Sequence, residues 1–218
     1  MELKNKKILF LGDSITAGVG TSQGESTAFW SILGRRTGAI VRGYGIGGTC
    51  IARQHTPLYP EMDEPYFGTR VDAMDIEADV VVVFGGTNDY GHGDAPFGDM
   101  HDRTNDTFYG AMHLLCQALM RRYPRAEIVI MTPLHRLNEA AGINERGVRN
   151  CTTLEDYVDA ERRVAAYYGI PVLDTFRVSG LQPELSHLRE MYMPDGLHPN
   201  DAGHERLADR LIGFLKAL

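Results

Sequence analysis

The segment from Asp79 to Phe84, which reads DVVVVF, constrains the fold of this chain more than any other segment does. An unbroken run of β-branched residues is typical of a central parallel strand, because such a strand is buried on both faces. Shorter segments of strand-like composition occur at residues 7–11, 39–42, 127–131 and 170–173. Apolar residues recur at helical spacing over residues 26–37, 105–122, 153–168 and 200–218. The sequence therefore predicts alternating strands and helices.

Strand and helix alternate about five times, a pattern that predicts an α/β protein with helices on both sides of a parallel sheet. We expect a three-layer, doubly wound (flavodoxin-like) sandwich of about five mainly parallel strands, forming one domain over residues 1–218. Ligands of such sheets bind outside the carboxyl ends of the strands. Three long connections, residues 49–78, 89–104 and 132–152, should gather at that edge. Connections of this length are usually functional or mobile.

The composition narrows the class of protein further. A formal net charge of -7 over 218 residues argues against a nucleic acid as partner, because such partners require basic patches. The chain has only 3 cysteines, far apart, so neither a disulfide framework nor a zinc knuckle is indicated. Neither a signal peptide nor a membrane-spanning run is recognisable. These features predict a cytoplasmic protein without membrane contact.

The first strand ends in Gly12-Asp13-Ser14, where apolar residues give way abruptly to small and polar ones. One interpretation is a structural turn, in which Asp13 caps the backbone. The other is a nucleophile, Ser14, held at the strand end with its backbone N–H at the start of a helix beginning near Ile15. A serine hydroxyl needs a base to take its proton and donors to stabilise the oxyanion. The second interpretation therefore requires partners elsewhere in the chain.

A candidate base lies near the other end of the sequence, in Asp195-Gly196-Leu197-His198. An aspartate three residues before a histidine can accept a hydrogen bond from one ring nitrogen and leave the other facing a serine. Asp201 and His204 repeat this spacing. They fall in the first turns of the last predicted helix, where Asp201 more simply favours the helix N-terminus. His198 is therefore the preferred base.

Candidate oxyanion donors follow two other strands. Gly85-Gly86 permits a sharp turn after DVVVVF, and Asn88 then offers a side-chain amide at the edge of the sheet. The glycine block from Gly45 to Gly48 follows the second strand, where a glycine N–H can approach an oxyanion without a side chain in the way. Both segments are expected at the same edge as Ser14.

Four segments together resemble the SGNH (GDSL-type) hydrolase family: Gly12–Ile15, Gly45–Gly48, Gly85–Asp89 and Asp195–Asn200. They occur in the family's order, at strand ends, and span nearly the whole chain. The resemblance implies an esterase- or lipase-like acylhydrolase that needs no metal and no other cofactor.

The resemblance also assigns roles. Ser14 would be the nucleophile, His198 the general base and acid, and Asp195 the residue that orients His198. The oxyanion hole would consist of the backbone N–H groups of Ser14 and Gly48 and the side chain of Asn88.

The chain departs from the family pattern in one place. Many members carry an asparagine shortly before the second glycine block, where this chain has Gly43 and Tyr44. The support of this loop is therefore open, as is the choice between Gly47 and Gly48 as the donor; we expect Gly48.

Other interpretations compete for some of these residues. The stretch Gly43–Gly48 also matches a dinucleotide-binding fingerprint, but that motif needs a helix opening on the glycines, and only a short one fits here. One polar loop could bind zinc, although its spacing matches no tight ligand set and a solvated loop is the simpler interpretation. Its candidate ligands are His92, Asp94, His101 and Asp102.

Two further groups of residues could form part of a substrate pocket. A basic loop could meet an anionic acid or a sugar, although solvated surface is the simpler interpretation; it contains His135, Arg136, Arg146 and Arg149. Large side chains on the edge loops could line an acyl or sugar subsite or merely pack beneath the loops. They are Tyr66, Phe67, Tyr90, Met191 and Tyr192.

The sequence therefore predicts a serine-dependent ester hydrolase. The long loops are rich in Gly, Asp, His, Arg and Tyr and contain no long apolar run for a fatty chain. This composition favours short acyl esters of small molecules, acetylated carbohydrates in particular, over lipids. A thioesterase or lysophospholipase remains an alternative, as does a non-catalytic binding protein on the same fold.

Overall fold

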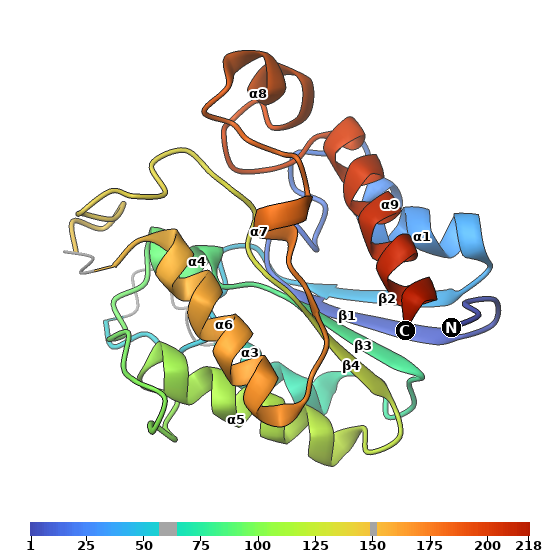
Figure 1. Cartoon of the computed structure of the whole chain (residues 1–218), viewed down its shortest axis with the longest axis horizontal. Helices are drawn as coiled ribbons and strands as arrows, with labels where there is room; N and C mark the ends of the chain where they lie inside the picture. Colours follow the sequence, from blue (N-terminus) through green and yellow to red (C-terminus); the bar gives the residue numbers. More distant parts are fainter. Residues whose placement is uncertain (57–64, 149–151) are drawn as a thin grey trace.

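The computed structural model describes residues 1–56, 65–148 and 152–218 (Figure 1). At its centre is a 5-stranded sheet in the order β2-β1-β3-β4-β5, and every neighbouring pair is parallel. The strands are β1 (Lys7–Gly12), β2 (Ile40–Gly45), β3 (Val80–Phe84), β4 (Glu127–Met131) and β5 (Val172–Leu173). The predicted doubly wound parallel sheet is therefore confirmed.

Helices cover both faces of the sheet, as Figure 1 shows. On one face, α1 and α9 pack against each other and against side chains such as Phe10 and Val82. On the other face, α3, α5 and α6 cover the alternate side chains, such as Leu9 and Val81. The bounds of these helices are Phe29–Thr37 for α1, Phe67–Arg70 for α3, Phe108–Arg122 for α5, Leu154–Tyr168 for α6 and Asp201–Ala217 for α9. Successive strand residues thus enter opposite cores, as the alternation of side chains along a strand requires.

Capping side chains fix the starts of the long helices. Thr107 accepts a hydrogen bond from the N–H of Gly110, and Asn200 accepts one from Gly203. Thr153 and Asp156 form the capping box that their spacing predicts. Because its capping residue Asn200 lies outside the helix proper, α9 begins one residue later than predicted, whereas α5 begins at Phe108, three residues after the predicted start.

Short helical elements lie between the regular ones. They are the 3₁₀ turns Gly24–Thr27 and Val71–Ala73, and the helices α4 (Thr87–Gly91), α7 (Thr175–Val178) and α8 (Ser186–Tyr192). The helix predicted from Ser26 is therefore split into a 3₁₀ turn followed by α1.

Two local predictions were wrong. Strand β2 extends through Gly45, although its glycines suggested an earlier end. A Cβ added to Gly43 would lie 2.5 Å from the ring of Trp30, and one added to Gly45 would lie 2.2 Å from the backbone nitrogen of Ala17. These glycines therefore permit close packing. The helix expected after Ser14 does not form either, because residues 13–20 make a series of turns.

The described parts of the long connections meet beyond the carboxyl ends of the strands, as predicted. The side chain of Asn144 donates to the carbonyl of Gly93 at 2.8 Å, and the N–H of Leu137 donates to the carbonyl of Gly196 at 2.9 Å. The loop after β4 thereby joins the loop after α4 to the segment before α9. None of the helices in the three described stretches of chain is long and apolar enough to cross a membrane.

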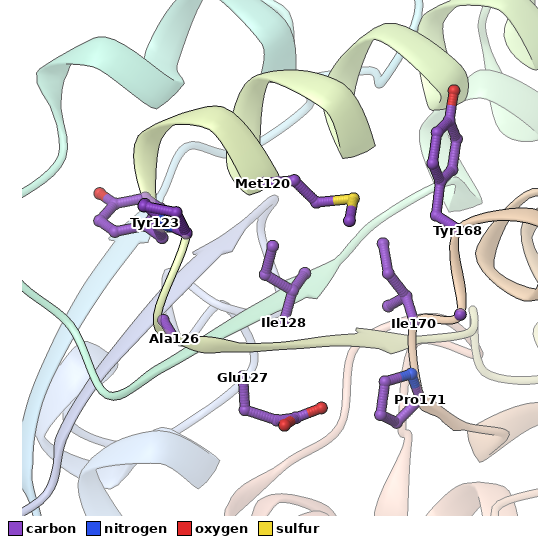
Figure 2. A pocket seen from close by; sticks show the side chains of 10 residues that line it. Met120, Tyr123, Ala126, Glu127, Ile128, Tyr168, Ile170 and Pro171 are labelled. Carbon is purple, nitrogen blue, oxygen red and sulfur yellow. The ribbon is translucent and has the colours of Figure 1, made fainter.

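A hollow lies at the other edge of the sheet, near the amino ends of β4 and β5 (Figure 2). It lies between the end of α5, where Met120 and Tyr123 are found, and the beginning of β4 at Glu127. Ile170 and Pro171, which precede β5, complete its wall. Because it adjoins the amino ends of the strands, it lies away from the edge where sheets of this kind bind ligands.

Candidate active site

Ser14 and His198 are in hydrogen-bond contact at the carboxyl edge of the sheet. The Nε2 atom of His198 lies 2.9 Å from the Oγ of Ser14. Ser14 lies two residues after Gly12, the last residue of β1, and is only 7% exposed to solvent. His198 lies in the turn before α9, so the contact joins the first strand to the segment that precedes the last helix.

Asp195 is hydrogen-bonded to the ring and to the backbone of His198. Its Oδ2 lies 2.7 Å from His198 Nδ1, and its Oδ1 accepts the backbone N–H groups of Leu197 and His198. A carboxylate can only accept, so Nδ1 carries the hydrogen and the neutral ring presents its Nε2 lone pair to Ser14. Burial alone would raise the pKa of Asp195, but the hydrogen bonds from His198 and Leu197 outweigh it and hold the pKa below its ordinary value.

The glycine turn after β2 lies alongside Ser14. The N–H of Thr49 reaches the carbonyl of Ile46 at 3.4 Å, and Gly48 has a φ of 76° at the third position of this turn. A positive φ at that position is the reason for a glycine there. A Cβ added to the preceding Gly47 would lie 3.8 Å from the Cβ of Ser14. Gly48 therefore belongs to a turn that borders the serine.

Asn88, in the first turn of α4, points its amide at the same turn. Its Nδ2 donates to the carbonyl of Thr49 at 3.0 Å, and the residue is only 5% exposed. An amide NH₂ has two hydrogens, so this contact occupies one of them. The structure thus brings the segments of Ser14, Gly48 and Asn88 together at one edge.

Arg70 lies beneath these segments and was not singled out by the sequence analysis. Its Nη2 donates to the carbonyl of Gly12 at 2.8 Å, and its Nη1 lies 3.3 Å from Thr49 Oγ1. The guanidinium rests on the ring of Phe67, 4.7 Å from the ring centroid. A recognisable signal is present in the sequence, because Arg70 stands among Phe67, Val71 and Met74, whose spacing is that of an inward helical face.

Two buried aspartates support the backbone near the site. Asp13 Oδ1 accepts the N–H of Ile15 at 3.0 Å, which is the backbone-capping contact that one interpretation of this turn assigned to Asp13. The carboxylate of Asp89 accepts the N–H groups of Ile51 and Ala52, both at 2.9 Å. Burial raises the pKa of Asp13 to about 6 and that of Asp89 to about 7, against the opposing effect of these hydrogen bonds.

The second Asp-x-x-His pair has a structural role. His204 is fully buried, accepts the N–H of Phe29 on its Nδ1 at 3.0 Å, and stacks on the ring of Phe29. Burial lowers the pKa of His204 to about 4. Asp201 lies in the first turn of α9, as expected, and its carboxylate also accepts the N–H and hydroxyl of Ser22. The preference for His198 over His204 therefore agrees with the packing.

The candidate zinc loop uses its carboxylates to hold backbone. Asp94 accepts the N–H groups of His55 and Thr56, and Asp102 accepts the N–H of Asp99 and the hydroxyl of Thr107. Among residues 1–56, 65–148 and 152–218, no three His, Cys, Asp or Glu side chains are grouped as metal ligands. The nucleotide interpretation also lacks its helix, because residues 46–56 form turns and irregular loop.

The basic loop is less solvated than its composition suggests. Arg136 and Arg146 both have side chains that are only 9% exposed, so surface solvation was the wrong interpretation for them. Arg136 donates to the carbonyl of Thr87 at 3.2 Å and pairs with Glu145. Arg149 falls outside the described residues. His135 hydrogen-bonds Glu139 and lies against Phe176.

The aromatic candidates divide between core and surface. Phe67 is fully buried in the core, and Tyr90 is 3% exposed and packs edge-on against Tyr157. Met191, at 54% exposure, is open to solvent on α8. Packing beneath the loops therefore explains Phe67 and Tyr90.

Comparison with known proteins shows the family of this chain. The model of the GDSL-like lipase/acylhydrolase family matches residues 10–206, which is most of the chain. A GDSL lipase from Mycobacterium tuberculosis is 26% identical over 99% of this chain and 84% of its own length. An acetylxylan esterase from Xylanibacter ruminicola is 22% identical over 96% of this chain but 43% of its own length.

Solved structures agree with the family match. A crystal structure of a Lactobacillus plantarum protein has a TM-score of 0.82 and 31% identity, and the alignment covers 98% of each chain. A lipase/acylhydrolase from Enterococcus faecalis has the same fold, with a TM-score of 0.67 at 21% identity over 97% of this chain and 96% of its own. The chain belongs to the GDSL-like lipase/acylhydrolase family and is an ester hydrolase.

Proposed function

We propose that this enzyme hydrolyses short-chain acyl esters of carbohydrates, acetyl esters above all, with Ser14 as nucleophile, His198 as general base and acid, and Asp195 as the residue that orients His198. The observation that carries the proposal is the continuous hydrogen-bond chain from Ser14 Oγ to His198 Nε2 and from His198 Nδ1 to Asp195. This chain has the geometry of a serine hydrolase relay, in which each group is within reach of the proton it must move.

In the first half-reaction, Ser14 Oγ attacks the ester carbonyl carbon while its proton passes to His198 Nε2. The carbonyl oxygen becomes an oxyanion, which the N–H groups of Ser14 and Gly48 and the free amide hydrogen of Asn88 stabilise. The imidazolium faces the carboxylate of Asp195 across 2.7 Å, which stabilises its positive charge. His198 then gives its proton to the leaving alcohol, and the acyl group remains on Ser14.

In the second half-reaction, water replaces the alcohol. His198 Nε2 takes a proton from the water as the water oxygen attacks the acyl carbon, and a second oxyanion forms among the same donors. Collapse of this intermediate breaks the bond to Ser14, whose oxygen recovers the proton from His198. The carboxylic acid leaves and the enzyme returns to its starting state.

Polar residues in a small hollow near α4 offer hydrogen-bonding groups to a carbohydrate. A hollow of about 170 Å³ beside the end of α4 is lined by the polar residues Arg136, Asn138, Asn144 and Glu145, and also by Ala141, Ile143 and the largely buried Tyr90. Sugar hydroxyls can form hydrogen bonds with the four polar residues of this lining. The similarity to an acetylxylan esterase is consistent with this assignment.

Fluorophosphonate labelling followed by intact-mass measurement tests the nucleophile. Wild type and the variant Ser22→Ala should each gain one adduct. Ser22 is an exposed serine whose hydroxyl is hydrogen-bonded to Asp201 and to no histidine base in the proposed mechanism, so its removal should not affect labelling. Ser14→Ala should gain none while keeping the wild-type melting temperature. An adduct on Ser14→Ala, or no adduct on folded wild type, would overturn the role of Ser14.

A substrate panel tests the acyl and alcohol preferences separately. Nitrophenyl esters of increasing chain length should show the highest kcat/KM for acetate, with a fall as the acyl chain grows. Acetylated xylose and xylan oligomers should be deacetylated faster than a lysophospholipid or an acyl thioester of equal acyl length. Faster turnover of the lipid or of the thioester would replace the proposed substrate class while leaving the serine mechanism intact.

A further inference from the structure

Arg70 occupies an unusual place for a charged side chain. It is 8% exposed, belongs to the one-turn helix α3, and lies under the loops that carry the candidate oxyanion donors. Burial lowers the pKa of Arg70 to about 10, so the side chain is still a cation at neutral pH. Burying an arginine is costly unless its donors are used, so its contacts indicate what it does in the fold.

The first contact of Arg70 is at the end of β1. Its Nη2 donates to the carbonyl of Gly12 at 2.8 Å, and this carbonyl also accepts the N–H of Ile46 at 3.2 Å. The carbonyl of Gly12 belongs to the peptide that leads into Asp13 and Ser14. Arg70 thus fixes the orientation of the backbone immediately before Ser14 and joins it to the start of the glycine turn.

The second contact is with Thr49, directly after Gly48. Arg70 Nη1 lies 3.3 Å from Thr49 Oγ1, and that hydroxyl donates to the carbonyl of Ile46 at 2.8 Å. The hydroxyl of Thr49 therefore joins the last residue of the turn that contains Gly48 to its first residue, Ile46. The carbonyl of Thr49 accepts the amide of Asn88. One guanidinium is thereby connected to the backbone around all the candidate oxyanion donors.

The residues that lead into the glycine turn are Gly43 and Tyr44. Both lie within β2, and the side chain of Tyr44 accepts the N–H of Asp75, away from the turn. The glycine turn is therefore stabilised by the side chains of Arg70 and Thr49 and not by the side chain of Tyr44 in β2.

We propose that Arg70 is a positioning residue for the oxyanion hole: its two guanidinium nitrogens tie the Gly12 carbonyl to the Thr49 hydroxyl and so hold the Ser14, Gly48 and Asn88 donors at one oxygen position. The inference rests on the proposed function, because it presumes that these donors stabilise the oxyanion. The two contacts are made by two nitrogens that the planar guanidinium holds apart, and the single ammonium nitrogen of a lysine cannot occupy both positions. A lysine should therefore not replace Arg70.

Steady-state kinetics on Arg70→Lys and Arg70→Met test the role. Misplaced oxyanion donors act in the transition state, so kcat should fall about 10²-fold in both variants while KM changes little. The matched control is Arg122→Met. Arg122 also stacks on an aromatic ring and donates to a backbone carbonyl, that of Met74, but lies at the end of α5 away from the site, so kcat should not change.

Rescue distinguishes positioning from a general packing role. Free guanidinium at sub-denaturing concentration should raise kcat of Arg70→Ala and leave kcat of Arg122→Ala unchanged. If circular dichroism shows that Arg70→Met or Arg70→Ala does not fold, the kcat of Arg70→Lys alone tests whether Arg70 positions the oxyanion donors. Wild-type kcat in Arg70→Lys would overturn the inference, as would a fall in kcat of the same size in the Arg122 variant. Absence of Ser14 labelling in folded wild type would instead overturn the proposed function.

Discussion

His198 Nε2 lies 2.9 Å from Ser14 Oγ although 184 positions separate the two residues in the chain. The contact forms because β1 delivers Ser14 to the carboxyl edge of the sheet, while the turn capped by Asp195 presents the His198 ring at the same edge. Both side chains are set by backbone contacts of their own. The site is therefore pre-formed, which is the arrangement expected where catalysis depends on orientation.

Replacing Asp195 by asparagine should lower kcat by at least about 10²-fold, because an amide cannot hold the required His198 tautomer or stabilise the imidazolium. Steady-state hydrolysis of a nitrophenyl ester measures the effect. The matched control is Asp201→Asn, which changes the aspartate of the other Asp-x-x-His pair and should leave kcat at the wild-type level. A similar loss in both variants would show that the effect is not specific to the relay.

Replacing Asn88 by alanine should lower kcat about 10²- to 10³-fold with little change in KM, because its amide stabilises charge that appears only in the transition state. The variant also loses the contact with the carbonyl of Thr49, so its melting temperature should be recorded. A rise in KM with unchanged kcat would place Asn88 in ground-state binding instead.

Replacing Gly45 by alanine should destabilise the protein by about 1–3 kcal/mol, because the added Cβ cannot be accommodated beside the backbone of the Ser14 turn. That Cβ would lie 2.2 Å from the nitrogen of Ala17. Displacement of the turn should also reduce kcat. Thermal unfolding and ester hydrolysis measure the two effects.

The matched control for Gly45 is Gly213→Ala, in the interior of α9. A Cβ at Gly213 meets nothing within 4 Å, and alanine is the better helix former by about 0.5–1 kcal/mol. This variant should raise the melting temperature and leave kcat unchanged. Destabilisation by Gly213→Ala would contradict the packing described for α9.

His204 should make stability depend on pH. Its folded pKa of about 4 is below the ordinary 6.5, so the unfolded chain binds more protons between these values. Stability from neutral His204 is therefore complete above about pH 6.5 and is lost as the pH falls toward 4, by roughly 3 kcal/mol in all. His204→Gln keeps an acceptor for the N–H of Phe29 but does not titrate.

Melting temperatures of wild type and His204→Gln between pH 4 and 7 check this sign. The variant should be less stable at neutral pH, because glutamine cannot reproduce the ring stacking on Phe29. The gap between the two curves should narrow as the pH falls, since only wild type loses the contribution of His204. Parallel curves would contradict a lowered pKa.

Local sequence features predicted much of the fold. The β-branched run of Val80–Phe84 and the apolar spacing of the helices depend on short-range periodicity, which the structure retains. The Thr153 capping box and the αL glycine at Gly169 were also readable, because each involves residues a few positions apart. Element ends were less predictable where a glycine such as Gly43 allowed a strand to pass beneath a tryptophan.

Other features could not be read from local pattern. Arg136 and Arg146 belong to a polar loop, yet their side chains are nearly buried because neighbouring loops fold over them. The two Asp-x-x-His pairs have the same spacing, and only packing makes the side chain of His198 18% exposed while His204 is fully buried. Burial depends on what the rest of the chain places around a residue, so equal spacing led to different surroundings.

The sequence by itself determined the alternation of strands and helices, the end of β1 at Ser14 and the local pairing of Asp195 with His198, because each depends on residues close together in the chain. Only the tertiary structure decided that His198 meets Ser14 and that Arg70 reaches the carbonyl of Gly12. Those contacts depend on the register of parallel strands and on the desolvation that packing imposes, and both arise from the whole fold.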